Sequence, residues 1–240
     1  MPGWTASWIP FIGYDDEGRQ LMFFVDAKAD GVTLLDDWTG MGQRTTASGT
    51  TVFDRVFVPD FHVFPYEKAA ASERPTRLLA ALIHSAIDLG IAEDALADAR
   101  DYILHSNRPW IDNPYDTHAK EPFIIQSFGE LGLKVRTAQR LLRHAAGEID
   151  AARASGLAAD ALEAGHATAD ARITCGRAAL DVADELFALT GARATQEKFD
   201  LDRHWRNART HTLHDPLRWK LYHLGNYFLN GIEPGPRSLI

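Results

Sequence analysis

The amino-acid sequence predicts an α+β protein that is mainly helical, with a partial β-sheet followed by an antiparallel helical bundle. Two observations predict this class. Before about Pro59, short runs of β-branched and aromatic residues alternate with turn residues, which is typical of strands. After a polar linker at Pro65–Pro75, apolar residues recur every three to four positions over three long segments, which is typical of amphipathic helices.

The strand-rich part, residues 1–64, is expected to form a partial β-domain. Four of its segments have the composition and alternation of strands: Trp8–Tyr14, Gln20–Asp26, Val32–Trp38 and Thr50–Pro59. The first two flank an acidic turn that contains Gly18, so they predict a β-hairpin. Four strands are too few for an independent sheet of ordinary size, and the domain is therefore predicted to be incomplete.

The remainder, residues 65–240, is expected to form a C-terminal helical bundle domain. Leu79, Ile83 and Ile87 follow the i, i+4 spacing of one helix face, and Gly191 is of the residue type that commonly ends a helix. Helices this long in a short chain favour a bundle larger than one copy, so a homo-oligomer, dimer or tetramer, is expected. Five helices are predicted: Arg74 to about Asn107, about Ile124 to Ala154, about Ala158 to Thr190, Arg203–Thr210 and Pro216–Asn230.

The overall composition is that of an ordinary soluble globular protein, with 45% hydrophobic and 24% charged residues. The net charge of −8 disfavours a nucleic-acid binder or a protein that binds anionic membranes. The sequence has no signal-peptide pattern and no run near the roughly 18 apolar residues of a membrane span, so a cytoplasmic protein is expected. The single cysteine, Cys175, lies among small apolar residues and predicts a buried, inert thiol.

The densest group of chemically useful side chains lies in and just after Arg203–Pro216. Four of the ten histidines fall between His204 and His223. Histidine is suited to proton transfer near neutral pH, and arginine matches the geometry of phosphate, so the segment fits a phosphorylated cofactor with a proton donor near its reactive end. A solvated helix face is the simpler explanation for three arginines that recur every third residue: Arg203, Arg206 and Arg209.

Structural roles compete with functional ones at the end of this segment. Asp215 and Pro216 have the residue types of a helix N-cap and first helical position, so a capping role for Asp215 is favoured over catalysis. His211 and His214 precede this helix start, where side chains are usually accessible, and a functional role for them stays open. A zinc site is disfavoured because no second ligand group has a matching spacing, and no metal is expected.

Arg108 stands where the first long helix is expected to end and a proline-containing loop begins. It could be a cation that favours the helix C-terminus. It could equally bind a phosphate, since loops of this length are often functional. The residues alone leave both roles open.

Several motifs occur along the chain in an order that indicates a family. They are GQRTTASGT with FDRVFVP (Gly42–Pro59), SNRPWID (Ser106–Asp112), IQSFGELG (Ile125–Gly132) and LTGARAT…LDRHWRNARTHTLHDP (Leu189–Pro216). Together they resemble the flavin-dependent monooxygenase branch of the acyl-CoA dehydrogenase superfamily, which contains the dibenzothiophene monooxygenases and related sulfur-acquisition oxidoreductases. The resemblance covers essentially the whole chain, and it implies the C-terminal part of the acyl-CoA dehydrogenase fold.

The resemblance also implies a function. Reduced flavin mononucleotide (FMN), in preference to FAD, would react with O2 to give a C4a-hydroperoxyflavin that oxygenates a small sulfur- or nitrogen-containing compound. A separate NAD(P)H:flavin reductase would supply the reduced flavin. His214 resembles the histidine that steadies or protonates the peroxide, with His211 near it. The expected cofactor-binding residues are Arg108, near the flavin phosphate, Phe128, and a loop that serves a neighbouring subunit in dehydrogenase relatives, Thr190, Gly191 and Ala192.

The sequence departs from the family pattern in two respects. Family members are far longer, so the chain is expected to be an N-terminally truncated member without the N-terminal helical domain and the first β-strands. Acyl-CoA dehydrogenases often carry a catalytic glutamate in a Tyr-Glu-Gly context, where this chain has His214, Asp215 and Pro216. Three hypotheses follow: a monooxygenase, a non-catalytic helical assembly module, and an acyl-CoA dehydrogenase-like flavoenzyme with Asp215 as base.

Overall fold

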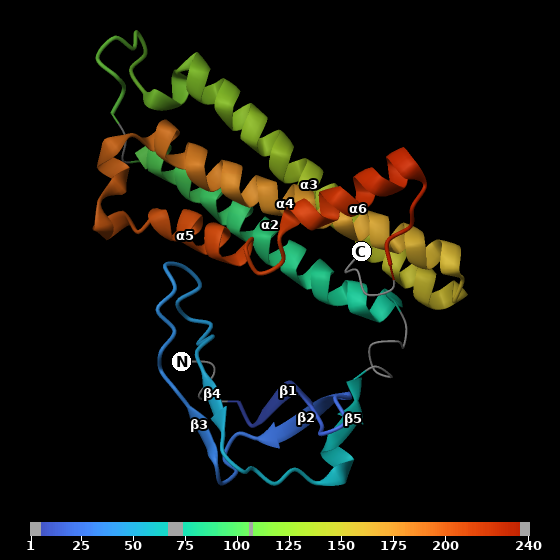
Figure 1. The fold of residues 1–240 in the computed structure, drawn as a ribbon. Coiled ribbons are helices and arrows are strands. Elements are labelled where there is room, and N and C mark those ends of the chain that lie inside the picture. The colour runs from blue at the N-terminus through green and yellow to red at the C-terminus, as the bar shows by residue number, and fades with distance from the viewer. Residues whose placement is uncertain (1–5, 67–73, 106–107, 236–240) are drawn as a thin grey trace. The chain divides into compact units, whose positions relative to one another are not determined.

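A computed structural model describes residues 6–66, 74–105 and 108–235 (Figure 1). The chain divides into two compact units, one that ends at Arg74 and one that begins at Pro75. The first unit contains small antiparallel sheets and the second contains the long helices. The predicted fold class, a mainly helical α+β protein with a partial sheet before a bundle, is confirmed.

The strand unit is built on an antiparallel hairpin. Strand β1 (Trp8–Tyr14) pairs with β2 (Gln20–Asp26), and β2 also pairs with β5 (Val63–Pro65). The turn between the first two strands closes where the Gly18 backbone adopts a positive φ of 76°, which a glycine tolerates best. Phe11 stacks between Phe23 and Phe53, with ring centroids 4.7 and 4.5 Å apart, and joins the hairpin to the second sheet.

The two later strands are shorter than the sequence predicts. Strand β3 covers only Val32–Leu34 and pairs with β4, which covers only Thr51–Phe53. Local hydrogen bonds stop the ladder, because the Asp37 carboxylate accepts the Thr50 backbone N–H at 2.8 Å. The short strand β5 is not among the predicted strands, because Val63–Pro65 lies where the last predicted strand gives way to the polar linker.

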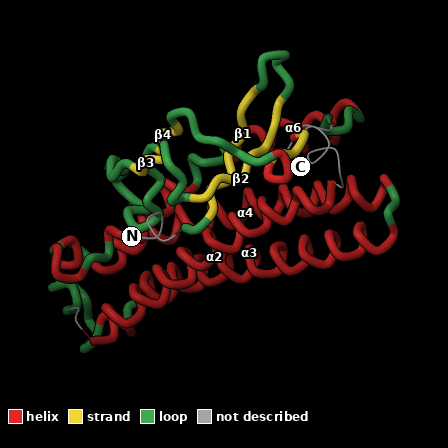
Figure 2. The backbone as a smooth tube through the Cα atoms, turned by 90° about the horizontal axis from the view of Figure 1, so that it is seen from below, coloured by secondary structure: helices red, strands yellow, loops and turns green. Residues whose placement is uncertain are grey.

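Within the described residues of the helical unit there are five α-helices, close to the predicted positions. Helix α2 covers Arg74–His105, α3 covers Pro122–Ser155, α4 covers Ala158–Thr190, α5 covers Asp202–His211 and α6 covers Leu217–Asn230. The predicted bounds of α4 are confirmed at both ends. Figure 2 shows α2, α3 and α4 running side by side as long helices.

Alanines allow α3 and α4 to pack closely. Fully buried alanines recur every seven residues on both helices, at Ala138, Ala145 and Ala152 of α3 and at Ala164, Ala171 and Ala178 of α4. A seven-residue repeat keeps a small-residue stripe on one side of a helix, so two such helices can lie along each other. The two helices meet at a tight turn, where Gly156 has a φ of 66° and its N–H caps the Ala152 carbonyl at 3.0 Å.

None of the helices within the described ranges is long and apolar enough to cross a membrane. This finding concerns only residues 6–66, 74–105 and 108–235.

Candidate functional site

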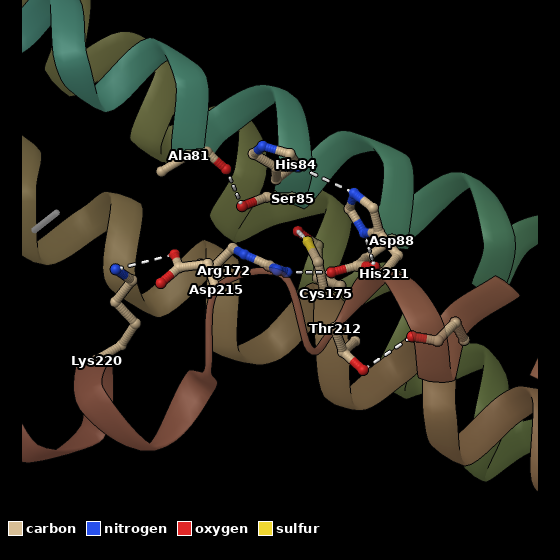
Figure 3. A network of polar contacts seen from close by, with 12 residues as sticks. Ala81, His84, Ser85, Asp88, Arg172, Cys175, His211, Thr212, Asp215 and Lys220 are labelled. Atoms are coloured by element: carbon tan, nitrogen blue, oxygen red, sulfur yellow. Dashed lines mark hydrogen bonds and ion pairs between the residues drawn. The ribbon is translucent and has the colours of Figure 1, made fainter. Parts of the chain in front are cut away.

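A buried ion pair lies between α2 and α4 (Figure 3). Arg172 Nη1 contacts Asp88 Oδ2, and both side chains are fully buried. Gly176 lies one turn beyond Arg172 on α4, and a Cβ there would come within 3.4 Å of Asp88 Oδ2 and 3.0 Å of Leu217. The absent side chain at Gly176 therefore leaves room for the carboxylate between the helices.

Two histidines continue this pair toward the surface. His211 ends α5, and its Nδ1 lies 2.6 Å from Asp88 Oδ1. His84 lies one turn before Asp88 on α2, and its Nδ1 is 3.0 Å from His211 Nε2. The four groups form one continuous chain of polar contacts that starts in the protein interior (Figure 3).

His214 completes the chain at the surface. Its side chain is exposed, and its ring stacks on that of His84 with centroids 4.5 Å apart and an angle of 28°. Burial and the neighbouring His214, His211 and Arg172 lower the pKa of His84, and Asp88 opposes them only in part. These surroundings favour the neutral form of His84.

The structure brings the predicted catalytic pair together in an arrangement that differs from expectation. His211 was expected to be accessible, but it is 8% exposed and lies against the Asp88 carboxylate. His214 is exposed, as its position before a helix start suggested. His84 contacts both of these histidines, His211 through a hydrogen bond and His214 through ring stacking.

The predicted capping role of Asp215 is wrong. Helix α6 begins at Leu217 with Pro216 as its N-cap residue, and no side chain caps it. The carboxylate of Asp215 instead forms an ion pair with Lys220, with 3.0 Å between Oδ2 and Nζ (Figure 3). Lys220 is buried, so its charge needs a partner nearby, and this requirement outweighs the capping preference of the aspartate.

Three residues of this row of polar contacts were not predicted from the sequence: His84, Asp88 and Arg172. A signal was present for the last two, because each places a charge within an apolar face of a long helix. The partners are distant along the sequence, since Arg172 lies 84 positions and His211 lies 123 positions after Asp88. A single sequence does not show which of its charges are paired across such distances.

The predicted cofactor-binding residues lie elsewhere in the helical unit. Arg108, Gly191 and Ala192 are exposed, Phe128 packs half-buried against the core, and the buried Thr190 donates its hydroxyl to Leu186 O at 2.7 Å. Arg108 follows the end of α2, whereas His84 lies near its start. At ~1.5 Å per residue, His84 and the end of α2 at His105 are about 32 Å apart.

The predicted helix face of arginines is largely ion-paired. Arg206 lies 2.8 Å from Asp202 and 3.0 Å from Asp200, and Arg203 Nη2 lies 2.7 Å from Asp98. These contacts replace the solvated face that the spacing suggested.

One group of potential metal ligands occurs within the described ranges, formed by Asp94, Asp98 and His204. Arg203 Nη2 lies 2.7 Å from Asp98 and 3.5 Å from Asp94, so a guanidinium takes the place that a cation would need. Burial would raise the pKa of Asp98, but hydrogen bonds from His204 and Arg203 outweigh it and lower this pKa. The group is best explained as an ionic link between α2 and α5.

Cys175 is fully buried on α4, as predicted, and burial raises the pKa of its thiol to about 12. We expect the native chain to react with a disulfide reagent at about pH 8 some ~10³-fold more slowly than the unfolded chain, because only the thiolate reacts. Absorbance of the released reagent thiol measures both rates. Equal rates for the two states would contradict the burial of Cys175.

Comparison with known proteins places the chain among flavoenzyme relatives. Residues 82–219 match the family described as acyl-CoA dehydrogenase, C-terminal domain. The chain is 37% identical over 226 residues to the probable FMNH2-dependent monooxygenase SfnC of Pseudomonas putida, covering 91% of this chain and 57% of the relative. It is 36% identical over 234 residues to the dibenzothiophene monooxygenase of Mycolicibacterium goodii, covering 93% of this chain and 56% of the relative.

Solved structures agree with the sequence relatives. The complex of TdsC from Paenibacillus sp. A11-2 with FMN and indole superposes with a TM-score of 0.89 at 27% identity, covering 98% of this chain and 63% of TdsC. The chain thus spans a little over half the length of the curated relatives it matches. The match over residues 82–219 covers the three long helices, apart from the first turns of α2, together with α5 and the start of α6. The chain belongs to the acyl-CoA dehydrogenase C-terminal-domain family.

Proposed function

We propose that this chain is part of a flavin-dependent monooxygenase that oxygenates a small sulfur- or nitrogen-containing compound. The observation that carries the proposal is the exposed His214, which stacks on the half-buried His84 and is linked through it to the buried His211 and Asp88. His214 is a possible proton donor at the surface, and hydrogen bonds connect its neighbour His84 to the buried Asp88 carboxylate. Such an arrangement suits a reaction in which protons accompany electron transfer. The relatives named for FMNH2 and dibenzothiophene support the same class.

The residues around His214 fit a reduced flavin. Reduced FMN, when bound, supplies the electrons that activate dioxygen. His214 would offer a ring N–H at the point where negative charge develops, and a preorganised donor of this kind stabilises such charge. His84 packs against the His214 ring and holds its plane. FMN is proposed rather than FAD, in keeping with the FMN-bound relative.

A homo-oligomer would complete the site. Arg108, Gly191 and Ala192 are exposed near the end of α2 and α4, about 32 Å along α2 from His84 by its ~1.5 Å rise per residue. One flavin cannot span that distance, so two copies would each contribute one end. Large apolar side chains exposed on α6 support such contacts between copies: Trp219, Leu221, Tyr222, Phe228 and Leu229.

The substrate class and the partner follow from the same relatives. Dibenzothiophene and indole are both small fused heteroaromatic compounds, one with sulfur and one with nitrogen. A substrate of this kind is proposed here. An enzyme that consumes reduced flavin needs a source of it, so a separate NAD(P)H:flavin reductase is proposed as the partner. Dehydrogenation of an acyl-CoA with Asp215 as base is disfavoured, because the Asp215 carboxylate is paired with Lys220.

An anaerobic titration with reduced FMN tests the proposal. We expect saturable binding in the micromolar range, followed by the change in flavin absorbance or fluorescence. Reduced riboflavin is the matched control, since it lacks the phosphate that Arg108 and the Gly191 loop are proposed to hold, and it should bind more weakly. No binding of reduced FMN at high micromolar concentration would refute a flavin role for this chain.

A further inference from the structure

The contacts of the buried Asp88–Arg172 pair determine which ring nitrogen of His211 carries a hydrogen. Arg172 stays protonated at any ordinary pH, so the carboxylate of Asp88 beside it stays ionised. An ionised carboxylate only accepts hydrogen bonds. The hydrogen in the 2.6 Å contact between Asp88 Oδ1 and His211 Nδ1 therefore belongs to His211.

The position of the hydrogen on His211 also determines the tautomer of His84. A neutral His211 that carries its hydrogen on Nδ1 has a bare Nε2, which can only accept. His84 Nδ1 lies 3.0 Å from that nitrogen and must be the donor. The Nε2 of His84 is then bare too, and both rings are in the Nδ1–H form, whereas free histidine in water favours Nε2–H.

We propose that Asp88 is a positioning residue that fixes His211 and His84 as Nδ1–H tautomers, so that together the two rings take up one proton beneath His214. The proton enters at Nε2 of His84. The Nδ1 proton of His84 then passes to Nε2 of His211, and the resulting imidazolium is stabilised by the Asp88 carboxylate. No bond other than N–H forms or breaks, and the reverse transfer returns the proton toward the His214 side.

Charged groups on every neighbouring element bear on this uptake. Asp88 lies on the same helix as His84, Arg172 comes from α4, and His211 and His214 come from α5 and the turn after it. The Asp215–Lys220 pair belongs to that turn and to α6 and is neutral overall. Arg172 opposes a second positive charge, whereas Asp88 favours one, so the two rings should hold one added proton and not two.

We call the proton path through His84 and His211 the relay. Its role in catalysis rests on the proposed function, but its existence does not. Long-range proton–nitrogen correlation spectra of the ¹⁵N-labelled chain without flavin distinguish the two tautomers of each ring. We expect both His211 and His84 in the Nδ1–H form at about pH 8, with signals assigned by their loss in His211→Gln and His84→Gln. On acidification, signals of both rings should shift with a common midpoint. An Nε2–H form at either ring, or two independent midpoints, would overturn the proposal.

Variants test whether Asp88 is the cause. The double variant Asp88→Asn with Arg172→Met removes both buried charges together, which protects the fold. An asparagine amide can donate as well as accept, so His211 and His84 should lose their uniform Nδ1–H form. Asp94→Asn, at an exposed position on the same helix, is the matched control and should leave both tautomers unchanged. Retention of both Nδ1–H forms in the double variant would show that Asp88 does not set them.

The flavin titration separates this inference from the proposed function. Fixed tautomers without flavin binding would leave the relay intact and refute the monooxygenase role. Flavin binding with unfixed tautomers would do the opposite.

Discussion

Asp88→Asn is expected to lower the free energy of unfolding of the helical unit by ~3–5 kcal/mol, because it leaves the Arg172 guanidinium buried without a counter-charge. Arg172 is fully buried, and within the described part of the chain its Nε and Nη2 have no hydrogen-bond partner even when Asp88 is present. The carboxylate therefore provides most of the compensation for this charge. Urea unfolding followed by far-ultraviolet circular dichroism measures the change.

Two variants show whether the loss comes from the unpaired charge. Asp94→Asn removes a carboxylate that is 63% exposed and 3.5 Å from Arg203, so it should cost at most about 1 kcal/mol. Asp88→Asn combined with Arg172→Met should recover most of the stability, since replacing a buried pair with apolar groups is often nearly neutral. A double variant as unstable as Asp88→Asn alone would mean that packing, and not charge, accounts for the effect.

The helices could be predicted from the sequence because their signals are local. The apolar period marks a helix over its whole length, and a glycine marks its end, as at Gly156 and Gly191. The hairpin of Trp8–Tyr14 and Gln20–Asp26 has the same kind of local signal in its alternation and turn. Strand lengths after it depend on contacts such as Asp37 with Thr50, which alternation does not report.

The candidate site was predicted only in part, for a physical reason. His211 and His214 stand in a motif that resembles a known family, so the sequence alone already suggests them as candidates. His84, Asp88 and Arg172 carry no local motif, and their role depends on contacts between α2, α4 and α5. For Asp215 the local pattern predicted a helix N-cap, and this prediction was wrong. The carboxylate pairs instead with the buried Lys220, a contact that the local pattern does not show.

His214→Ala is expected to uncouple oxygen consumption from substrate oxygenation in the flavin-loaded protein. General acid–base groups typically contribute 10²–10⁴-fold to a rate, so the oxygenation rate should fall by at least about 10²-fold. Reduced flavin would still react with dioxygen in the variant, and the oxygen should leave as hydrogen peroxide. Parallel assays of oxygen uptake, peroxide and oxygenated product, with reduced FMN from a flavin reductase, measure the ratio.

The comparison with a second histidine decides whether this effect belongs to the site. His144 lies on α3 with a half-exposed side chain beside Glu148, outside the chain of contacts that leads to Asp88, so His144→Ala should keep the parent ratio of product to oxygen. His84→Gln should fall between the two, because it removes the ring on which His214 stacks but leaves the exposed imidazole. If His214→Ala kept the parent ratio while flavin binding was unchanged, the proton would have to come from another group, and His214 would be no more than a surface residue beside a buried ion pair.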